Sequence, residues 1–410
     1  MLSRSITPKL LETLQFHPIV LLLGGRQTGK TTLLQMIMKS QPYHYISFDN
    51  LNVLSSAQRD PMTFVQLLPI PVIIDEVQRV PEIFLPLKQL VDEHKKPGMV
   101  IMTGSANPLL TATIADSLAG RMALLRLMPL SQGEMLQRNE DIISYLFTDQ
   151  WRLKQVQPLT RATLLAMLCH GGYPGLPTTD NQAQIDIWFN SYLTTILERD
   201  VQDLAQIEGI KELPHLLQLL ATRTGGLLNV AELSRSTDIT HSTLKRYLTL
   251  LEAVFLVYEL QPWFNKLGKR LVKSSKIYLS DTGLAAYLMG MTPEKLILNP
   301  TLIGSLLENF VVQEIAKQLT WSTTRATQYH LRTVSGTEVD IVLEAASGEL
   351  VGIEIKASQT INTDDFKGLK ALQELCPDKF KRGIVLYGGQ DPLPFGPNMF
   401  ALPIQTLWQH

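Results

Sequence analysis

The sequence predicts an α/β protein whose N-terminal part is a doubly wound parallel sheet. Three observations lead to this fold class. Apolar runs of strand length alternate with helical runs over the first third of the chain. The runs at 18–23 and 71–74 are apolar throughout, as is typical of strands buried on both faces of a sheet. The first run leads through a glycine loop into a helix, and the second ends in two acidic residues. Polar groups therefore follow the carboxyl ends of these strands, where ligands bind in doubly wound sheets.

Length and composition bound the class of protein. A chain of 410 residues should hold two to four domains, and its 45% hydrophobic and 18% charged residues exclude a disordered protein. The formal net charge is −1, so any affinity for nucleic acid must come from a local basic patch. Two distant cysteines, Cys169 and Cys376, match no metal spacing and are expected to be small buried residues in a reducing compartment. No run approaches the roughly 20 apolar residues that cross a bilayer, so we expect a cytoplasmic protein with no membrane partner.

The segment 24–31 fits the phosphate-loop pattern G-x-x-x-x-G-K-[ST] between a strand and a helix. Its glycines let backbone N–H groups curl around a phosphate, and the helix N-terminus adds partial positive charge. Lys30 would reach the β and γ phosphates, and the Thr31 hydroxyl would ligate Mg²⁺. The alternative is a chance glycine turn before a helix. The predicted ATP-binding residues are Gly24, Gly25, Arg26, Gln27, Thr28, Gly29, Lys30, Thr31 and Thr32.

The strand at 71–74 ends in Asp75 and Glu76, which would supply the second half of an ATP-hydrolysing site. A strand beside the phosphate loop would deliver Asp75 to the Mg²⁺ shell and Glu76 to an attacking water as general base. The alternative is an acidic turn after a core strand. We predict catalysis by Glu76 with Lys30.

Polar residues also follow the next predicted strand, at 99–102. Thr103, Ser105 or Asn107 could sense the γ-phosphate or orient the water, but their spacing does not show which.

These motifs, together with the segments 117–121 and 129–131, resemble the AAA-type ATPases (AAA+ superfamily) of bacteria and archaea that carry a poorly characterised C-terminal region. The resemblance extends over essentially the whole chain, including 233–283 and 304–358. It implies a homo-oligomer in which Arg121 reaches into a neighbouring subunit's site as an arginine finger and neutralises transition-state charge. The alternative for Arg121 is a surface salt bridge.

Composition shifts divide the chain, and the breaker cluster at 171–177 marks a boundary or hinge. The predicted domains are an ATPase core at 1–130, a helical lid or linker at 131–176, a helical and winged-helix domain at 177–290 and a nuclease-like domain at 300–410.

Helices at 230–235 and 241–253, a tight turn between them, and strands at 255–261 and 276–279 predict a winged helix-turn-helix. The segment 265–276 holds five basic residues and no acidic one, as phosphate contact requires. We predict mostly sequence-nonspecific contact with DNA; the alternatives are a protein-binding wing or a face packed on the ATPase core. The predicted DNA-contacting residues are Ser242, Thr243, Lys245, Arg246, Lys266, Lys269, Arg270 and Lys273.

The C-terminal third has the predicted order helix, three strands, helix, strand. Asp340 and Glu354 lie on neighbouring strands, where two carboxylates can hold Mg²⁺, and Lys356 on the same face as Glu354 can position or deprotonate a water. This order with Asp…Glu-x-Lys is similar to the restriction-endonuclease-like (PD-(D/E)xK) nucleases, in which the helix glutamate would be Glu308, a further ligand of this second Mg²⁺. Such domains also persist as inactive DNA-holding or packing modules.

The sequence as a whole predicts a Mg²⁺-dependent AAA-type ATPase that acts on or with DNA. Two alternatives stay open: an ATP-gated DNA nuclease, and a nucleotide-switched regulator whose winged helix binds a protein partner.

Overall fold

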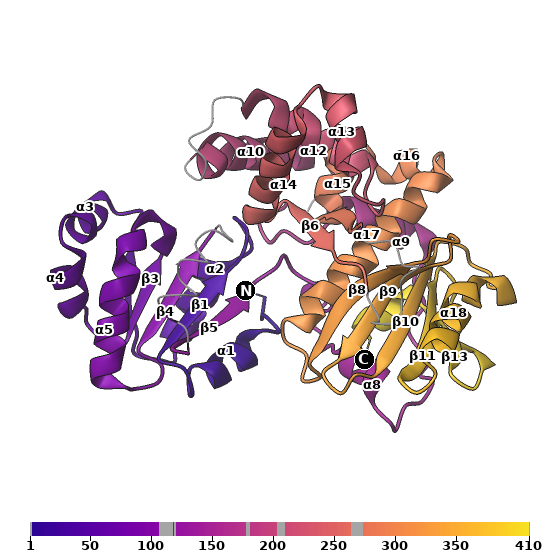
Figure 1. The fold of residues 1–410 in the computed structure, drawn as a ribbon, viewed down its shortest axis with the longest axis horizontal. Helices are drawn as coiled ribbons and strands as arrows, with labels where there is room; N and C mark the ends of the chain where they lie inside the picture. The colour runs from indigo at the N-terminus through magenta and orange to yellow at the C-terminus, as the bar shows by residue number, and fades with distance from the viewer. Residues whose placement is uncertain are drawn as a thin grey trace. The chain divides into compact units, whose positions relative to one another are not determined.

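The computed structural model describes residues 2–105, 118, 120–177, 181–202, 210–263 and 274–409 (Figure 1). Contacts within the chain divide it into two compact units. The first contains Met1–Leu130 with Tyr173–Gly175 and Ala253–Phe255, and the second contains Ser131–Gly172, Leu176–Glu252 and Leu256–His410. The chain passes from the first unit to the second after residue 130, and the domain bounds expected from the sequence stay predictions.

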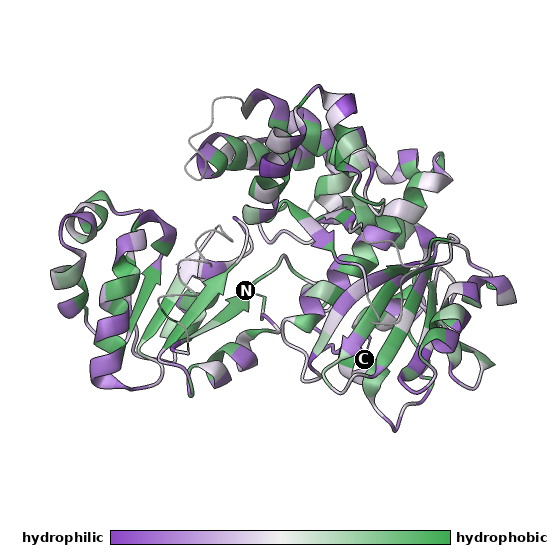
Figure 2. Cartoon of the chain, viewed as in Figure 1, coloured by the Kyte–Doolittle hydropathy of each residue, from purple (hydrophilic) through white to green (hydrophobic). Residues whose placement is uncertain are grey.

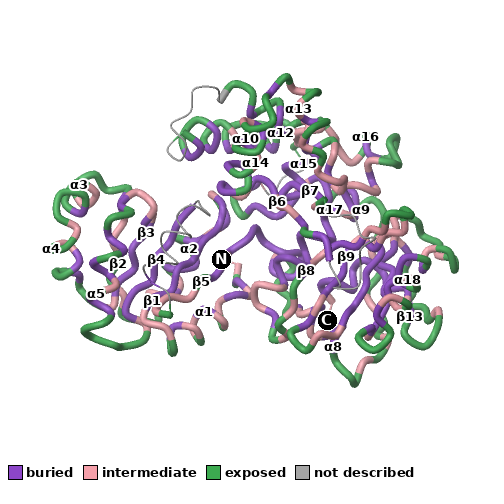
Figure 3. The backbone as a smooth tube through the Cα atoms, viewed as in Figure 1, coloured by how far each residue is buried: buried purple, intermediate pink, exposed green. Residues whose placement is uncertain are grey.

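The first unit is built on a parallel sheet with the strand order β2-β3-β4-β1-β5. Every residue of β1, β3 and β4 is buried, so the apolar runs of the sequence form the centre of the sheet (Figures 2 and 3). Because the strands are parallel, the residues that follow β1, β3 and β4 meet at one edge. The strands are β1 (Ile19–Leu23), β2 (His44–Ser47), β3 (Val72–Asp75), β4 (Val100–Gly104) and β5 (Met122–Arg126).

Two helices of this unit, α3 and α4, begin at side-chain caps. The Asn50 side chain accepts from the backbone N–H of Asn52 and Val53 and starts α3, and the Asp60 carboxylate accepts from Thr63 N–H and starts α4. The core packs apolar residues of the sheet against Phe84 and Leu87 of α5, among others. The helices are α1 (Thr7–Thr13), α2 (Lys30–Met38), α3 (Leu51–Arg59), α4 (Pro61–Gln66) and α5 (Phe84–His94).

The second unit contains a mixed sheet with the order β12-β13-β11-β10-β9-β8. β8, β9 and β10 are antiparallel neighbours, whereas β10, β11 and β13 are parallel. The predicted order of helix, three strands, helix and strand is present. Its elements are α17 (Pro300–Leu319), β8 (Ala326–Arg332), β9 (Glu338–Ala345), β10 (Leu350–Lys356), α18 (Lys367–Leu375), β11 (Phe380–Tyr387), β12 (Leu393–Gly396) and β13 (Met399–Pro403).

Helices and a hairpin make up the rest of the second unit. Thr240 Oγ1 accepts from Thr243 N–H at 3.3 Å and caps α14. β6 and β7 pair antiparallel after α14. The elements are α9 (Arg161–His170), α10 (Gln182–Thr195) with a π-helical end at Ile196–Asp200, α12 (Leu213–Thr222), α13 (Val230–Thr237), α14 (His241–Ala253), β6 (Val257–Leu260), β7 (Lys276–Leu279), α15 (Thr282–Leu288) and α16 (Pro293–Ile297).

The predicted helical lid differs from the structure. Only α7 (Gln132–Met135), α8 (Ile142–Phe147) and α9 are helical before the hinge, and residues 151–160 form neither helix nor strand. Two side chains near the C-terminus hold this segment: Gln409 and Gln390 accept from the backbone N–H groups of Gln157 and Leu159 at 2.6 and 3.1 Å. These long-range partners replace the helical hydrogen bonds, so this segment belongs to the second unit.

Candidate functional site

The phosphate loop joins the buried end of β1 to the start of α2. Gly29 has φ of 92°, in the left-handed region that glycine adopts without strain. A Cβ on Gly24 would lie 2.1 Å from the carbonyl oxygen of Leu127, so this position has room only for glycine. The two glycines are therefore required for different reasons, one for its backbone angle and one for the close approach of the chain after β5.

Lys30 lies across this loop. Its Nζ donates to the carbonyl oxygens of Gly24 and Gly25 at 2.7 and 3.0 Å, and the residue is 7% exposed. Thr28 Oγ1 donates to the same Gly25 carbonyl at 2.9 Å. The ammonium is thus held within the loop, where phosphate oxygens could replace the carbonyls as its partners.

Arg4 supports the loop from outside the motif. Its guanidinium donates to the Thr28 carbonyl at 2.6 Å and to the Met128 carbonyl at 2.7 Å, and the residue is buried. Sequence reasoning missed this residue, because no local pattern links Arg4 to a loop more than twenty residues away.

Asp75 ends β3 beside the helix that follows the loop. One carboxylate oxygen, Oδ2, accepts from Thr31 Oγ1 at 3.3 Å and from the Tyr45 hydroxyl at 2.5 Å. The other, Oδ1, accepts from the buried Thr103 hydroxyl. Burial and the Asp75 carboxylate raise the pKa of Tyr45, so its hydroxyl stays protonated and donating. The hydroxyl and carboxylate oxygens of Thr31 and Asp75 are the hard ligands that Mg²⁺ prefers, so this donor set fits the ion.

Glu76 takes a left-handed backbone conformation, with φ of 58° and ψ of 45°, which is uncommon for a residue other than glycine. Such strain concentrates at functional sites. Its Oε2 accepts from Ser105 Oγ at 3.0 Å and from the Gln78 amide, and Gln78 Nε2 also donates to Ser105 Oγ at 3.0 Å. Of the three residues considered as γ-phosphate sensors, Thr103 contacts Asp75, Ser105 contacts Glu76, and Asn107 lies outside the described residues.

Arg121 lies at the opposite end of the same sheet. It precedes β5, and its carbonyl accepts from the N–H of Ile19 at the start of β1, whereas the phosphate loop follows the end of β1. Its guanidinium pairs with the exposed carboxylate of Asp92, Nε to Oδ1 at 2.5 Å and Nη2 to Oδ2 at 3.0 Å, and this bond lowers the pKa of Asp92. Within the chain, Arg121 therefore lies at the end of the sheet away from the phosphate loop.

In the second unit, the predicted acidic residues Glu308 and Asp340 lie around Lys276. The sequence indicated Lys276 only as part of the basic segment 265–276. Lys276 Nζ lies 2.8 Å from Glu308 Oε1 and 3.4 Å from Asp340 Oδ1. It also lies 2.5 Å from Glu338 Oε1, a contact that the sequence did not indicate. The Tyr278 hydroxyl donates to Glu308 Oε1 at 2.8 Å. We call Lys276, Glu308, Glu338 and Asp340 the lysine–carboxylate cluster.

Glu354 and Lys356 lie beside this cluster on β10. Lys356 Nζ is 3.4 Å from Glu354 Oε2, and Asp340 Oδ2 accepts from the N–H of Ile355 at 3.0 Å. Burial and the Asp340 charge raise the pKa of both Glu354 and Glu308. Among the described residues, no group of three or more His, Cys, Asp or Glu side chains is arranged to hold a metal ion. Two of the residues predicted to hold a second Mg²⁺, Glu308 and Asp340, therefore come together, but they do so around the ammonium of Lys276.

The predicted DNA-contacting residues are described only in part. On α14, Ser242, Lys245 and Arg246 are exposed and Thr243 is half-buried, whereas Leu244 faces the core. The remaining residues of this prediction, all within 264–273, lie outside the described residues: Lys266, Lys269, Arg270 and Lys273.

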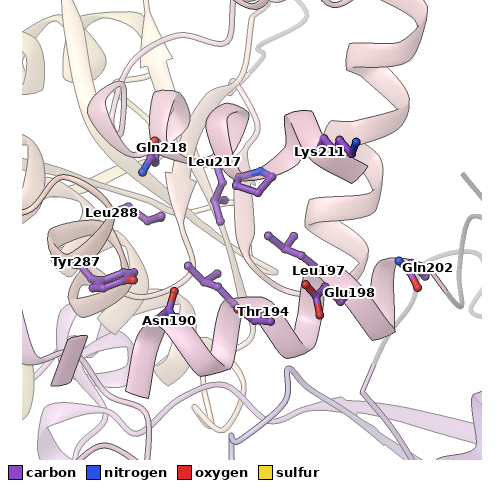
Figure 4. A pocket seen from close by; sticks show the side chains of 12 residues that line it. Asn190, Thr194, Leu197, Glu198, Gln202, Lys211, Leu217, Gln218, Tyr287 and Leu288 are labelled. Atoms are coloured by element: carbon purple, nitrogen blue, oxygen red, sulfur yellow. The ribbon is translucent and has the colours of Figure 1, made fainter. Parts of the chain in front are cut away.

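A cavity of about 770 Å³ lies between α10, its π-helical end, α12 and α15 (Figure 4). Its lining is part apolar, with Leu197 and Leu217, and part polar, with Glu198 and Lys211. None of the predicted site residues contributes to it.

The family comparisons define the class of the first unit. Residues 16–136 match the family described as an AAA domain. With the parallel sheet and the phosphate loop, this match makes the first unit an AAA-type ATPase domain that binds ATP, as the sequence predicted. Residues 161–295 and 303–407 match two domains of unknown function, DUF8612 and DUF4143. The predicted winged helix and nuclease-like domain therefore stay predictions.

Relatives that match nearly the whole chain show which family it belongs to. It is 31% identical over 406 residues to an uncharacterized protein of Mycobacterium tuberculosis, a match that covers 98% of this chain and 84% of that protein. It is 23% identical over 410 residues to an uncharacterized protein of Methanocaldococcus jannaschii, covering 95% and 86% of the two chains. The chain belongs to the family of the mycobacterial protein.

Among solved structures, the chain is similar to a Walker-type ATPase of Pyrococcus abyssi, with a TM-score of 0.46 and 17% identity over 70% of this chain and 96% of that one. It is also similar to the RuvB Holliday junction branch migration motor of Thermotoga maritima, with a TM-score of 0.30 and 17% identity over 63% and 89% of the two chains. None of the described helices is long and apolar enough to span a membrane.

Proposed function

We propose that this protein is a Mg²⁺-dependent ATPase that couples ATP hydrolysis to work on DNA as a homo-oligomer. One observation carries the hydrolytic part: Asp75 contacts Thr31 of the phosphate loop, and the next residue, Glu76, is held by Ser105 and Gln78. These contacts support a metal-binding pair of Thr31 and Asp75, and Glu76 as general base, at the carboxyl edge of the sheet beside the phosphate loop.

Each residue has a distinct role in this proposal. The loop N–H groups and Lys30 bind the phosphates, and Thr31 and Asp75 hold Mg²⁺. When bound, Mg²⁺ would neutralise charge on the phosphate oxygens. Glu76 accepts the proton of the attacking water, while Ser105 and Gln78 keep its carboxylate oriented.

Two substitutions test the hydrolytic assignment in the full-length chain. Lys30→Ala should abolish ATP binding, whereas Glu76→Gln should bind ATP normally and lose roughly 10²- to 10⁴-fold in kcat, as expected for loss of a general base. Binding is measured with a fluorescent ATP analogue and turnover by phosphate release. Glu82→Gln, an exposed glutamate of the same unit, serves as the matched control. Normal hydrolysis by Glu76→Gln would show that another group activates the water.

The DNA part rests on the exposed face of α14, which presents Ser242, Lys245 and Arg246. It also rests on the basic composition of the sequence at 265–273. Phosphate contact by these cations would be mostly sequence-nonspecific and would release counterions. We expect duplex affinity to fall steeply with salt, and the salt slope to shrink in the double variant Lys245→Ala/Arg246→Ala. Absence of binding to duplex and single strand at low salt would instead favour a regulator whose α14 face binds a protein partner.

A second candidate function is cleavage of DNA by the C-terminal unit. The observation that favours it is the convergence of Asp340, Glu354 and Lys356 on β9 and β10, described above. Two carboxylates and a lysine can bind Mg²⁺ and position a water. Plasmid cleavage with Mg²⁺ or Mn²⁺ tests this, with Asp340→Ala as control. Equal background nicking by both proteins would show that the wild-type protein does not cleave that substrate.

A further inference from the structure

The Lys276 ammonium occupies the centre of the lysine–carboxylate cluster. Three carboxylate oxygens surround Nζ, from Glu338 at 2.5 Å, Glu308 at 2.8 Å and Asp340 at 3.4 Å. An ammonium has three N–H donors, so these three oxygens use its full hydrogen-bonding capacity. The Lys276 side chain is 2% exposed, so the pairing takes place away from water.

The charge of Lys276 is stable in this position. Burial by itself lowers the pKa of an amine, but Glu308, Asp340 and Glu338 outweigh this effect and raise the pKa of Lys276 above its ordinary value. The same cation in turn lowers the pKa of Glu338 despite its burial. The lysine therefore stays protonated at neutral pH and acts as a counter-ion to the three carboxylates.

The ammonium also occupies one carboxylate oxygen each of Glu308 and Asp340, two of the predicted metal ligands. Glu308 Oε1 and Asp340 Oδ1 both point at Lys276 Nζ, and Asp340 Oδ2 is engaged by Ile355 N–H. Any divalent cation shared by Glu308 and Asp340 would lie beside a buried positive charge, which repels it in a site of low dielectric.

We propose that Lys276 is an internal counter-ion that excludes divalent cations from Glu308 and Asp340 and so keeps the C-terminal acidic site inactive. The lysine comes from β7 of the hairpin, whereas the carboxylates come from α17 and β9, so the pairing is an autoinhibitory contact between two substructures of the unit. This inference rests on the proposed nuclease-like site, and its test has a readout that does not depend on cleavage.

The experiment measures Mn²⁺ binding to the full-length, nucleotide-free protein by isothermal titration calorimetry. Wild type and Asp340→Asn should bind the same number of Mn²⁺ ions, because Lys276 already excludes metal. Lys276→Met removes the charge at similar length, and it should bind an additional Mn²⁺ that the double variant Lys276→Met/Asp340→Asn does not bind.

Lys381→Met is the matched control. Lys381 also pairs with two carboxylates, Asp149 at 2.8 Å and Glu349 at 2.7 Å, but outside the cluster, so its removal should not add a metal site. If Lys276→Met does not fold, Lys276→Gln is used in its place. The comparison of wild type with Asp340→Asn does not depend on either Lys276 variant.

Two results would overturn the inference: loss of a bound Mn²⁺ when Asp340→Asn is introduced into wild type, or no additional Mn²⁺ in folded Lys276→Met. Plasmid cleavage by Lys276→Met is scored separately. Added Mn²⁺ binding without cleavage would support the counter-ion role and reject the nuclease function, so the two failures are distinguishable.

Discussion

The guanidinium of Arg4 donates a hydrogen bond of 2.6 Å to the carbonyl oxygen of Thr28, and a second of 2.7 Å to the carbonyl of Met128. The residue therefore ties the start of the chain to the phosphate loop and to the segment that follows β5. Both bonds are buried, so the two carbonyls depend on this side chain in place of water.

Arg4→Ala should weaken ATP binding about tenfold or more. Leaving a buried carbonyl without its donor costs about 1–3 kcal/mol, and about 1.4 kcal/mol corresponds to a tenfold change in affinity. Titration with a fluorescent ATP analogue measures this, and Arg59→Ala, an exposed arginine of α3, is the control. Unchanged affinity in Arg4→Ala would show that the loop keeps its shape without these bonds.

Ser105 acts through Glu76 in the proposed mechanism, so Ser105→Ala should lower kcat about tenfold and leave ATP affinity unchanged. The Ser105 hydroxyl donates to Glu76 Oε2 at 3.0 Å. In a Glu76→Gln background the same substitution should have almost no further effect, because residues that act as a unit are not additive. Equal losses in both backgrounds would contradict a positioning role.

Arg121 is predicted to complete the site of a neighbouring subunit, so Arg121→Ala should lower kcat without changing ATP affinity. Asp92→Ala removes the same ion pair and should not lower kcat. Mixing Arg121→Ala with Glu76→Gln protein should restore part of the activity, because mixed interfaces combine an intact site with an intact arginine. Phosphate release by the mixture is the measurement; the absence of rescue would leave Arg121 as a surface ion-pair residue.

Glu140 should make the second unit less stable as the pH rises. Burial, with repulsion from Glu314 and Glu134, raises the pKa of Glu140 from 4.5 to about 8, against the opposing effects of Ser131 and Lys317. A carboxyl with a raised folded-state pKa binds more protons when folded, so its stabilising contribution is complete below about pH 4.5 and is lost as the pH rises to about 8.

Thermal unfolding between pH 5 and 9 measures this effect. Glu140→Gln, which keeps the shape without the titrating proton, should flatten the fall in Tm over this interval, whereas Glu374→Gln, at an exposed position of α18, should not. The same slope in Glu140→Gln and wild type would assign the pH dependence to another group.

Local patterns could predict the first unit because its chemistry is encoded in short segments. A strand, a glycine loop and a helix start lie within a few residues of one another, and Asp75 and Glu76 directly follow an apolar strand. The parallel sheet brings such strand ends to a single edge, so the predicted residues meet there. The absence of helix at 151–160 was not predictable in this way, because the partners of this segment, Gln390 and Gln409, lie far along the chain.

By itself, the sequence determined the phosphate loop, the acidic pair after β3, and the order of elements in the C-terminal unit. The tertiary structure alone decided what those residues touch. Arg4 lies 24 positions from Thr28 and Lys276 lies 64 positions from Asp340, and no periodicity spans such distances. The physical reason is burial. The neighbours of Lys276 in the sequence predicted a solvated basic segment, but folding removes Lys276 from water. A buried cation needs carboxylate partners, and the fold supplies them from distant parts of the chain.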